Sequence, residues 1–161
     1  MITTMKYIPL QLLAIITAIL LTGCETPTAT FQEVKSTLAP QPGKALVFIY
    51  YKHLQGTFNS EPNCRIYANQ QLVCKRLETR LFCSYQADPG QLHLSTRATF
   101  TAGLPVGVPK DLLVIQVDQN KIYYVQLSVR LFDDQPLKLV SNEVGEDEMK
   151  DFQWLNPLSS R

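Results

Sequence analysis

Four cysteines carry the most reactive side chains of this 161-residue chain: Cys24, Cys64, Cys74 and Cys83. Thiolates bind zinc, act as nucleophiles and form disulfides. However, the sequence contains no C-x-x-C pair, and its two histidines, His53 and His93, lie far apart. Zinc sites need paired ligands at short spacing, so we expect no metal and no cofactor, and structural roles for the thiols.

Other catalytic patterns are equally absent from the sequence. It has no G-x-S-x-G elbow, Walker loop, dinucleotide-binding glycine pattern or H-E-x-x-H motif. Ser84 is a candidate nucleophile, but no histidine is expected close enough to activate it. Asp133-Asp134 is typical of a turn, and the acidic cluster from Glu143 to Asp151 is typical of the solvated side of a helix. We therefore predict no catalytic residues and a protein that is not an enzyme.

Cys24 stands at the end of an uncharged, largely apolar run over residues 7–24, which Lys6 precedes. This layout is typical of a secretory signal. Leu21-Thr22-Gly23-Cys24 resembles the bacterial lipobox. The resemblance implies that diacylglycerol is attached to the Cys24 thiol, that residues 1–23 are removed, and that the new amine receives an acyl chain such as palmitate. An uncleaved membrane span and an ordinary cleavage site beside Cys24 are the alternatives.

The predicted location is the bacterial cell envelope. By resemblance to the sorting of Gram-negative lipoproteins, Glu25 after Cys24 favours a lipid anchor in the outer membrane, facing the periplasm. The whole chain carries 15 Lys plus Arg against 14 Asp plus Glu. Loss of Lys6 with the signal would leave a neutral product, so the overall charge predicts no steering toward nucleic acid or anionic lipid.

The region that follows is expected to contain a tether over residues 24–43 and one domain over residues 44–161. Pro27, Pro40 and Pro42 lie among threonines and serines, a composition typical of a spacer. Thr30 and Glu33 nevertheless have the spacing of a capping box. A short helix and an extended stalk are both consistent with this segment.

Beyond Gly43 the pattern predicts a mainly antiparallel all-β domain, a small β-sandwich of about seven to eight strands with a short C-terminal helix over 143–152. Ala45 to Tyr51 is a continuous apolar run of strand length. Period-two alternation marks residues 91–100, 113–117 and 123–131, the last placing Tyr124 on the polar side. Shorter strands are expected over 64–68, 71–76, 81–86 and, at an edge, 136–140. Asn69-Gln70 is expected to connect the first two of them.

Two pairs of strands look like hairpins. Asp118 to Lys121 would connect 113–117 with 123–131, and Glu78-Thr79 would connect 71–76 with 81–86. The second hairpin places Cys74 directly opposite Cys83, where the Cα atoms approach to about 4.5 Å and a disulfide is allowed. Pairing that involves Cys64, such as Cys64 with Cys74, and the absence of any bridge are the alternatives. With either bridge, one of these thiols is left over.

Four aromatic residues are candidates for contact with a sugar or a protein, although core packing is the commoner role of such rings. They are Tyr50, Tyr51, Tyr124 and Trp154. His93 falls on the polar side of its strand and is expected to be solvated.

Short motifs over about residues 44–140 resemble the bacterial lipoprotein domain called domain-of-unknown-function family 2846. They are Gly43 to Tyr51, Arg65 to Asn69, Asp88 to Leu94 and Lys121 to Val125. The resemblance implies a β-sandwich and no assigned activity. We therefore expect a non-enzymatic binding or structural module of the envelope, which contacts a protein or a cell-wall component and no nucleic acid. A lipoprotein that binds a small ligand, a lipid or a glycan, is the alternative.

Overall fold

The computed structural model describes residues 29–52, 63–99, 105–106, 112–128 and 136–155. Their elements, in chain order, are α2 (Phe31–Thr37), β1 (Ala45–Tyr51), β2 (Asn63–Ala68), β3 (Gln71–Leu77), β4 (Leu81–Ala87), β5 (Gly90–Thr99), β6 (Pro105–Val106), β7 (Leu113–Val117), β8 (Ile122–Leu127), β9 (Leu137–Val140), α3 (Asn142–Met149) and β10 (Gln153–Trp154). Strands β6 and β10 have only two residues each. The other eight described strands and the short C-terminal helix confirm the predicted all-β sandwich.

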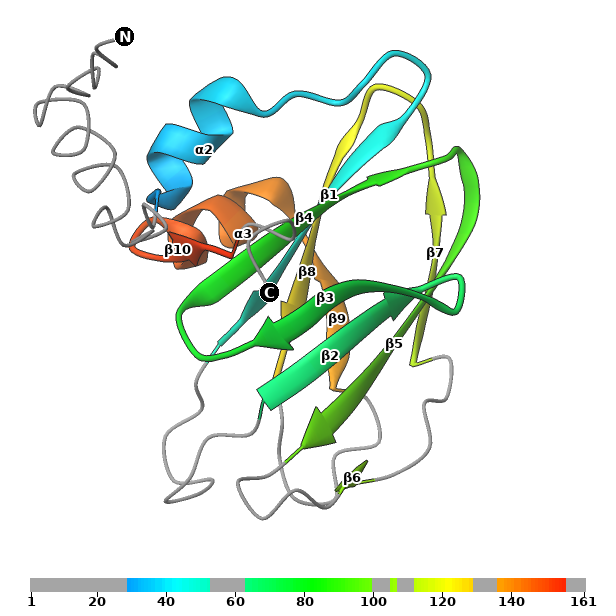
Figure 1. The fold of residues 1–161 in the computed structure, drawn as a ribbon. Helices are drawn as coiled ribbons and strands as arrows, with labels where there is room; N and C mark the ends of the chain where they lie inside the picture. Colours follow the sequence, from blue (N-terminus) through cyan, green and yellow to red (C-terminus); the bar gives the residue numbers. More distant parts are fainter. Residues whose placement is uncertain (1–28, 53–62, 100–104, 107–111, 129–135, 156–161) are drawn as a thin grey trace, which may run out of the picture.

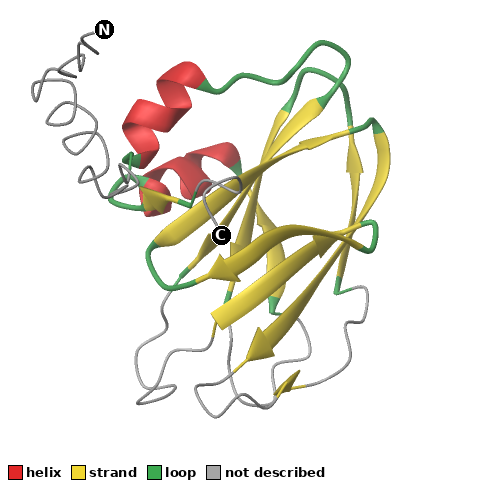
Figure 2. Cartoon of the chain, viewed as in Figure 1, coloured by secondary structure: helices red, strands yellow, loops and turns green. Residues whose placement is uncertain are grey.

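The molecule has three layers (Figures 1 and 2). Sheet A has the strand order β10-β4-β1-β8-β9, and sheet B has the order β3-β2-β5-β6, with β7 also paired to β5. Most neighbouring strands are antiparallel, whereas β1 with β8 and β10 with β4 are parallel. Both helices cover the face of sheet A that points away from sheet B. Neither described helix has the length and apolar content needed to cross a bilayer.

Strand β1 is the centre of this arrangement, and all seven of its side chains are buried. Leu46, Phe48 and Tyr50 pack beneath the helices. The alternate residues, among them Val47 and Ile49, face sheet B and join the core between the sheets. The uninterrupted apolar run that predicts this strand therefore reflects a strand that is covered on both faces.

Helix α2 confirms the helical alternative for the segment after Cys24. The Thr30 backbone N–H donates to Glu33 at 2.7 Å, and the Thr30 hydroxyl accepts from the Glu33 N–H at 3.5 Å, which completes the capping box. Phe31 and Val34 are buried against sheet A. Residues expected to act as a spacer thus include a helix packed on the domain.

Helix α3 lies close to β8 because its buried residue at the contact is Gly145. A Cβ atom at that position would lie 2.5 Å from Cβ and 2.6 Å from Cδ1 of Tyr124. The prediction that Tyr124 occupies a solvated face is wrong: the ring is fully buried under α3. Strand alternation shows only that two faces differ, and a helix arriving from later in the chain covers the second face.

Both predicted hairpins that would join 71–76 to 81–86 and 113–117 to 123–131 are wrong. Strand β3 pairs with β2 and β4 with β1, while β7 pairs with β5 and β8 with β1 and β9, so each connection crosses between the sheets. A two-residue hairpin of type I′ needs positive φ at both central residues. Asn69 and Gln70 meet this condition, with φ of 47° and 67°, and join β2 to β3 as predicted.

The two crossing connections each contain a single residue of positive φ, Arg80 at 62° and Asn120 at 60°. One such residue does not make the type I′ turn, so the strands are free to separate into different sheets. Alternating strands that face each other across a core look the same in sequence as strands paired edge to edge. Strand β9, by contrast, lies at the edge of sheet A, as predicted.

Candidate functional site

Cys74 and Cys83, the predicted disulfide pair, meet in the core between the sheets. Cys74 lies on β3 of sheet B and Cys83 on β4 of sheet A, so they approach across the sandwich and not along a hairpin. All three described cysteines are buried and carry free thiols in the structure. Cys24 lies outside the described residues, and its lipidation stays a prediction.

The three thiols differ in acidity. The hydrogen bond with Cys83 lowers the pKa of Cys74, whereas the bond with Cys74, together with burial, raises the pKa of Cys83. Burial raises the pKa of Cys64 to about 12. Since only the thiolate reacts readily, Cys74 is the most reactive of the three by this criterion. The contact of Cys74 with Cys83 supports their pairing, which stays a prediction.

The acidic cluster on α3 includes two residues that face the protein, so the prediction of a wholly solvated cluster is wrong for them. Glu148 accepts hydrogen bonds of 2.6 Å from each of the Tyr50 hydroxyl, the Lys52 ammonium and the Gln126 amide. Burial by itself would raise the pKa of Glu148, but the three donors outweigh it and hold that pKa below its ordinary value. All the donors lie on β1, β8 or directly after β1.

Glu146, two residues before Glu148 on α3, also joins this helix to other elements. It forms an ion pair of 2.7 Å with Lys35 of α2 and accepts a 3.2 Å hydrogen bond from the Tyr124 hydroxyl. The Lys35 hydrogen bond lowers the pKa of Glu146. Each of these carboxylates therefore links α3 to other elements of the fold and has a lowered pKa, which favours a structural role.

The remaining sequence candidates are scattered. Tyr50, Tyr51 and Tyr124 are buried in the core, and Trp154 packs against it. Ser84 and His93 are half-buried on β4 and β5, in different sheets. His53 and Asp133-Asp134 lie outside the described residues. Within the described residues, the structure therefore keeps Ser84 and His93 in different sheets.

It does bring four cations together on the outer face of sheet B, which we call the cationic row: Arg65, Lys75, Arg76 and Arg97. Arg65 on β2 is the register partner of Arg97 on β5. On its other side, a register shift in β3 leaves Lys75 and Arg76 both exposed beside it. The row therefore crosses three adjacent strands of one sheet.

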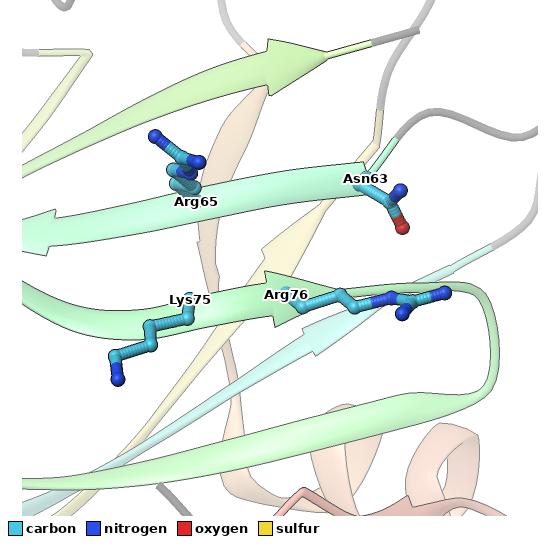
Figure 3. Close-up of a pocket in the computed structure, with 4 residues that line it drawn as sticks. All are labelled: Asn63, Arg65, Lys75 and Arg76. Atoms are coloured by element: carbon cyan, nitrogen blue, oxygen red, sulfur yellow. The ribbon is translucent and has the colours of Figure 1, made fainter. Parts of the chain in front are cut away.

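A pocket of about 190 Å³ opens within this row (Figure 3). Its lining residues are Asn63 and Arg65 from β2 and Lys75 and Arg76 from β3. Arg76 also forms an ion pair with Glu78, which follows β3. The pocket thus combines three cationic side chains with one amide, and one of the three cations pairs with a carboxylate.

The cationic row has an energetic cost. Like charges directly opposite each other on neighbouring strands are destabilising by a fraction of a kcal/mol to about 1 kcal/mol. In addition, the Nε of Arg97 is buried without a hydrogen-bond partner in the described part of the chain. Both features would be relieved by an anion on this face, since an oxyanion neutralises the charges and accepts from guanidinium donors.

An apolar pair lies beside the cationic row on the same face. Tyr67 follows Arg65 by two residues on β2, and its register partner on β3 is Leu72. The Tyr67 ring is half-buried and Leu72 is 39% exposed. This pair offers a flat carbon surface next to the charges.

Sequence reasoning missed this face. Strand alternation does place Arg65, Tyr67 and Arg97 on solvated positions. The register that aligns the cations across three strands is a property of the fold. A nearly balanced net charge does not show that positive charges gather on one face.

Comparison of the chain with protein-family models and with curated proteins finds no match. The resemblance to domain-of-unknown-function family 2846 therefore stays a prediction.

Proposed function

We propose that this protein is a lipid-anchored lipoprotein of the bacterial cell envelope, held in the outer membrane and facing the periplasm. Its β-sandwich acts as a non-enzymatic module that binds an anionic envelope component through the outer face of sheet B. The observation that carries this proposal is the cationic row, because it gathers positive charge on one face of a chain whose charges nearly balance overall.

The position of the described N-terminal end supports this orientation. Ala29 accepts a 2.8 Å hydrogen bond from the Trp154 N–H at β10, on sheet A. A chain from Cys24 to Ala29 spans at most about 18 Å. Acyl chains on Cys24 would therefore keep the sheet A side close to the membrane, and the outer face of sheet B belongs to the opposite layer.

The alternative, a lipid or glycan held between the sheets, has less support. The space between the sheets is filled by apolar side chains of both, including Val47, Ile49, Ile66 and Leu94, each fully buried. A small ligand on the outer face of sheet B remains compatible with the cationic row.

The anchor is tested by mass measurement of the protein isolated from its native host. We expect the mass of residues 24–161 plus a diacylglycerol group and one further acyl chain. A Cys24→Ser variant is the control, and it should retain residues 1–23 and lack the lipid. A wild-type chain that keeps residues 1–23 with an unmodified Cys24 thiol would overturn the proposed anchor.

A further inference from the structure

We propose that the outer face of sheet B binds a phosphorylated sugar, with the phosphate on the cationic row and the sugar ring against Tyr67. This inference deepens the proposed function, on which its orientation toward the periplasm rests. The binding chemistry itself depends only on residues of β2, β3 and β5.

The number of donors favours a phosphate over a carboxylate. Arg65, Lys75, Arg76 and the Asn63 amide line the pocket, and Arg76 also forms an ion pair with Glu78. A phosphate monoester carries three strong acceptor oxygens and close to two negative charges at neutral pH. A carboxylate carries two oxygens and would leave more of these donors without an acceptor.

The types of donor agree with this choice. The Arg65 and Arg76 guanidinium groups bind two phosphate oxygens at once, whereas Lys75 contributes a compact point charge. Asn63 adds an amide group to the lining, and its N–H groups are further donors for a phosphate oxygen. In Figure 3 these side chains extend in different directions, as neighbouring like charges do, so binding requires rotation of exposed side chains and no movement of the sheet.

The sugar is inferred from the surface next to the charges. Tyr67 and Leu72 lie on the same face as Arg65, one register pair farther along β2 and β3. Sugar rings present flat C–H surfaces that pack on aromatic rings, while their hydroxyls hydrogen-bond to polar neighbours. Ser95, the register partner of Tyr67 on β5, is a buried polar residue, so the sugar contact is assigned to Tyr67 and Leu72 alone.

The source is a soluble or wall-borne sugar phosphate and not the headgroup of the anchoring membrane. The pocket of about 190 Å³ is lined by residues of β2 and β3, two strands of sheet B. The anchored end of the chain also lies by sheet A, in the opposite layer.

Calorimetric titration of the full chain in detergent, at low salt, tests the proposal with glucose 1-phosphate as the probe. We expect saturable binding that falls at least tenfold in an Arg65→Gln, Arg76→Gln variant. A Lys138→Gln, Lys150→Gln variant removes the same charge from β9 and the end of α3, and should stay within twofold of the wild type. Thermal unfolding of each variant checks that the fold is retained.

Two further arms separate the parts of the proposal. Tyr67→Leu should weaken glucose 1-phosphate at least threefold and leave inorganic phosphate unchanged. Glucose alone should show no saturable binding. Equal binding of glucose 1-phosphate by the wild type and the double arginine variant would overturn the site, and an unchanged response to Tyr67→Leu would overturn the sugar contact.

Vesicles of phosphatidylcholine with phosphatidylglycerol form the last arm. Arginine-dependent binding of these vesicles without binding of glucose 1-phosphate would overturn the proposal in favour of a membrane surface. The titrations do not depend on lipid at Cys24, so loss of the proposed anchor and loss of the proposed ligand give separate results.

Discussion

The core cysteines show how position changes the behaviour of one residue type. All three thiols are buried, but Cys74 and Cys83 share a hydrogen bond across the two sheets, whereas burial alone dominates at Cys64. A bond between Cys74 and Cys83 would join sheet A to sheet B covalently. The pairing of Cys74 with Cys83 was predicted from a hairpin, whereas in the structure the two residues meet across the sandwich.

Alkylation of the exported, denatured protein tests this pair. We expect one of the three domain thiols to react before reduction and all three afterwards, because an oxidising compartment favours the bridge. The bridge should raise the free energy of unfolding by up to about 3 kcal/mol. Cys64→Ser should preserve the bridge and Cys74→Ser should abolish it. Three reactive thiols in the unreduced wild type would contradict the pairing.

At the scale of elements, α3 is joined to sheet A by polar as well as apolar contacts. Gly145 allows the close approach to Tyr124, and Glu146 and Glu148 accept hydrogen bonds from sheet residues. Burial raises the pKa of Tyr50, and the bond to Glu148 raises it further, so this hydroxyl remains a donor. Because the donors are partly buried, loss of the carboxylate would leave them unsatisfied.

Stability should therefore fall in acid through Glu148. Its pKa in the folded protein lies below its ordinary value of 4.5, so its contribution is complete above that value and is lost as the pH falls through the folded-state pKa. Glu148→Ala should cost about 2 to 3 kcal/mol at pH 7 and weaken the acid dependence. Chemical denaturation from pH 7 to pH 3 measures both effects.

Asp147→Asn is the matched control for this experiment. Asp147 neighbours Glu148 on α3, but its carboxylate is 78% exposed and pairs only with Lys150 among described interactions. Surface ion pairs contribute little, so we expect a change below about 1 kcal/mol. Equal effects of the two substitutions would contradict the role assigned to Glu148.

The whole molecule depends on its third layer. Phe31 of α2 is fully buried and meets Phe48, Phe82 and Tyr124 edge-on, at centroid distances of 5.6, 5.6 and 6.3 Å. These rings come from three strands of sheet A. Helix α2, which follows the predicted anchor in the chain, therefore covers sheet A. Part of the predicted tether is thus packed on the folded domain.

Phe31→Ala should destabilise the domain by about 3 to 5 kcal/mol, since it removes a fully buried ring and leaves a cavity above sheet A. Gln32→Ala changes the next, exposed residue of the same helix and should alter stability by less than about 0.5 kcal/mol. Urea denaturation compares the two. A small effect of Phe31→Ala would show that α2 acts as a detachable stalk.

Much of the architecture follows from local pattern. The apolar run of β1, the capping box at Thr30 and the turn residues Asn69 and Gln70 each correspond to the observed element, because strand burial, helix capping and positive φ are decided by a few adjacent residues. The same reasoning cannot pair strands that pack across a core, so the predicted pairings of β3 with β4 and of β7 with β8 are wrong.

The sequence by itself determined the all-β class, the positions of most strands and the candidate anchor at Cys24. Only the tertiary structure decided that Cys74 and Cys83 meet across two sheets and that Arg65, Arg76 and Arg97 share one face. The physical reason is that side-chain alternation and turn preference act over neighbouring residues, whereas strand register is set by how the whole core packs.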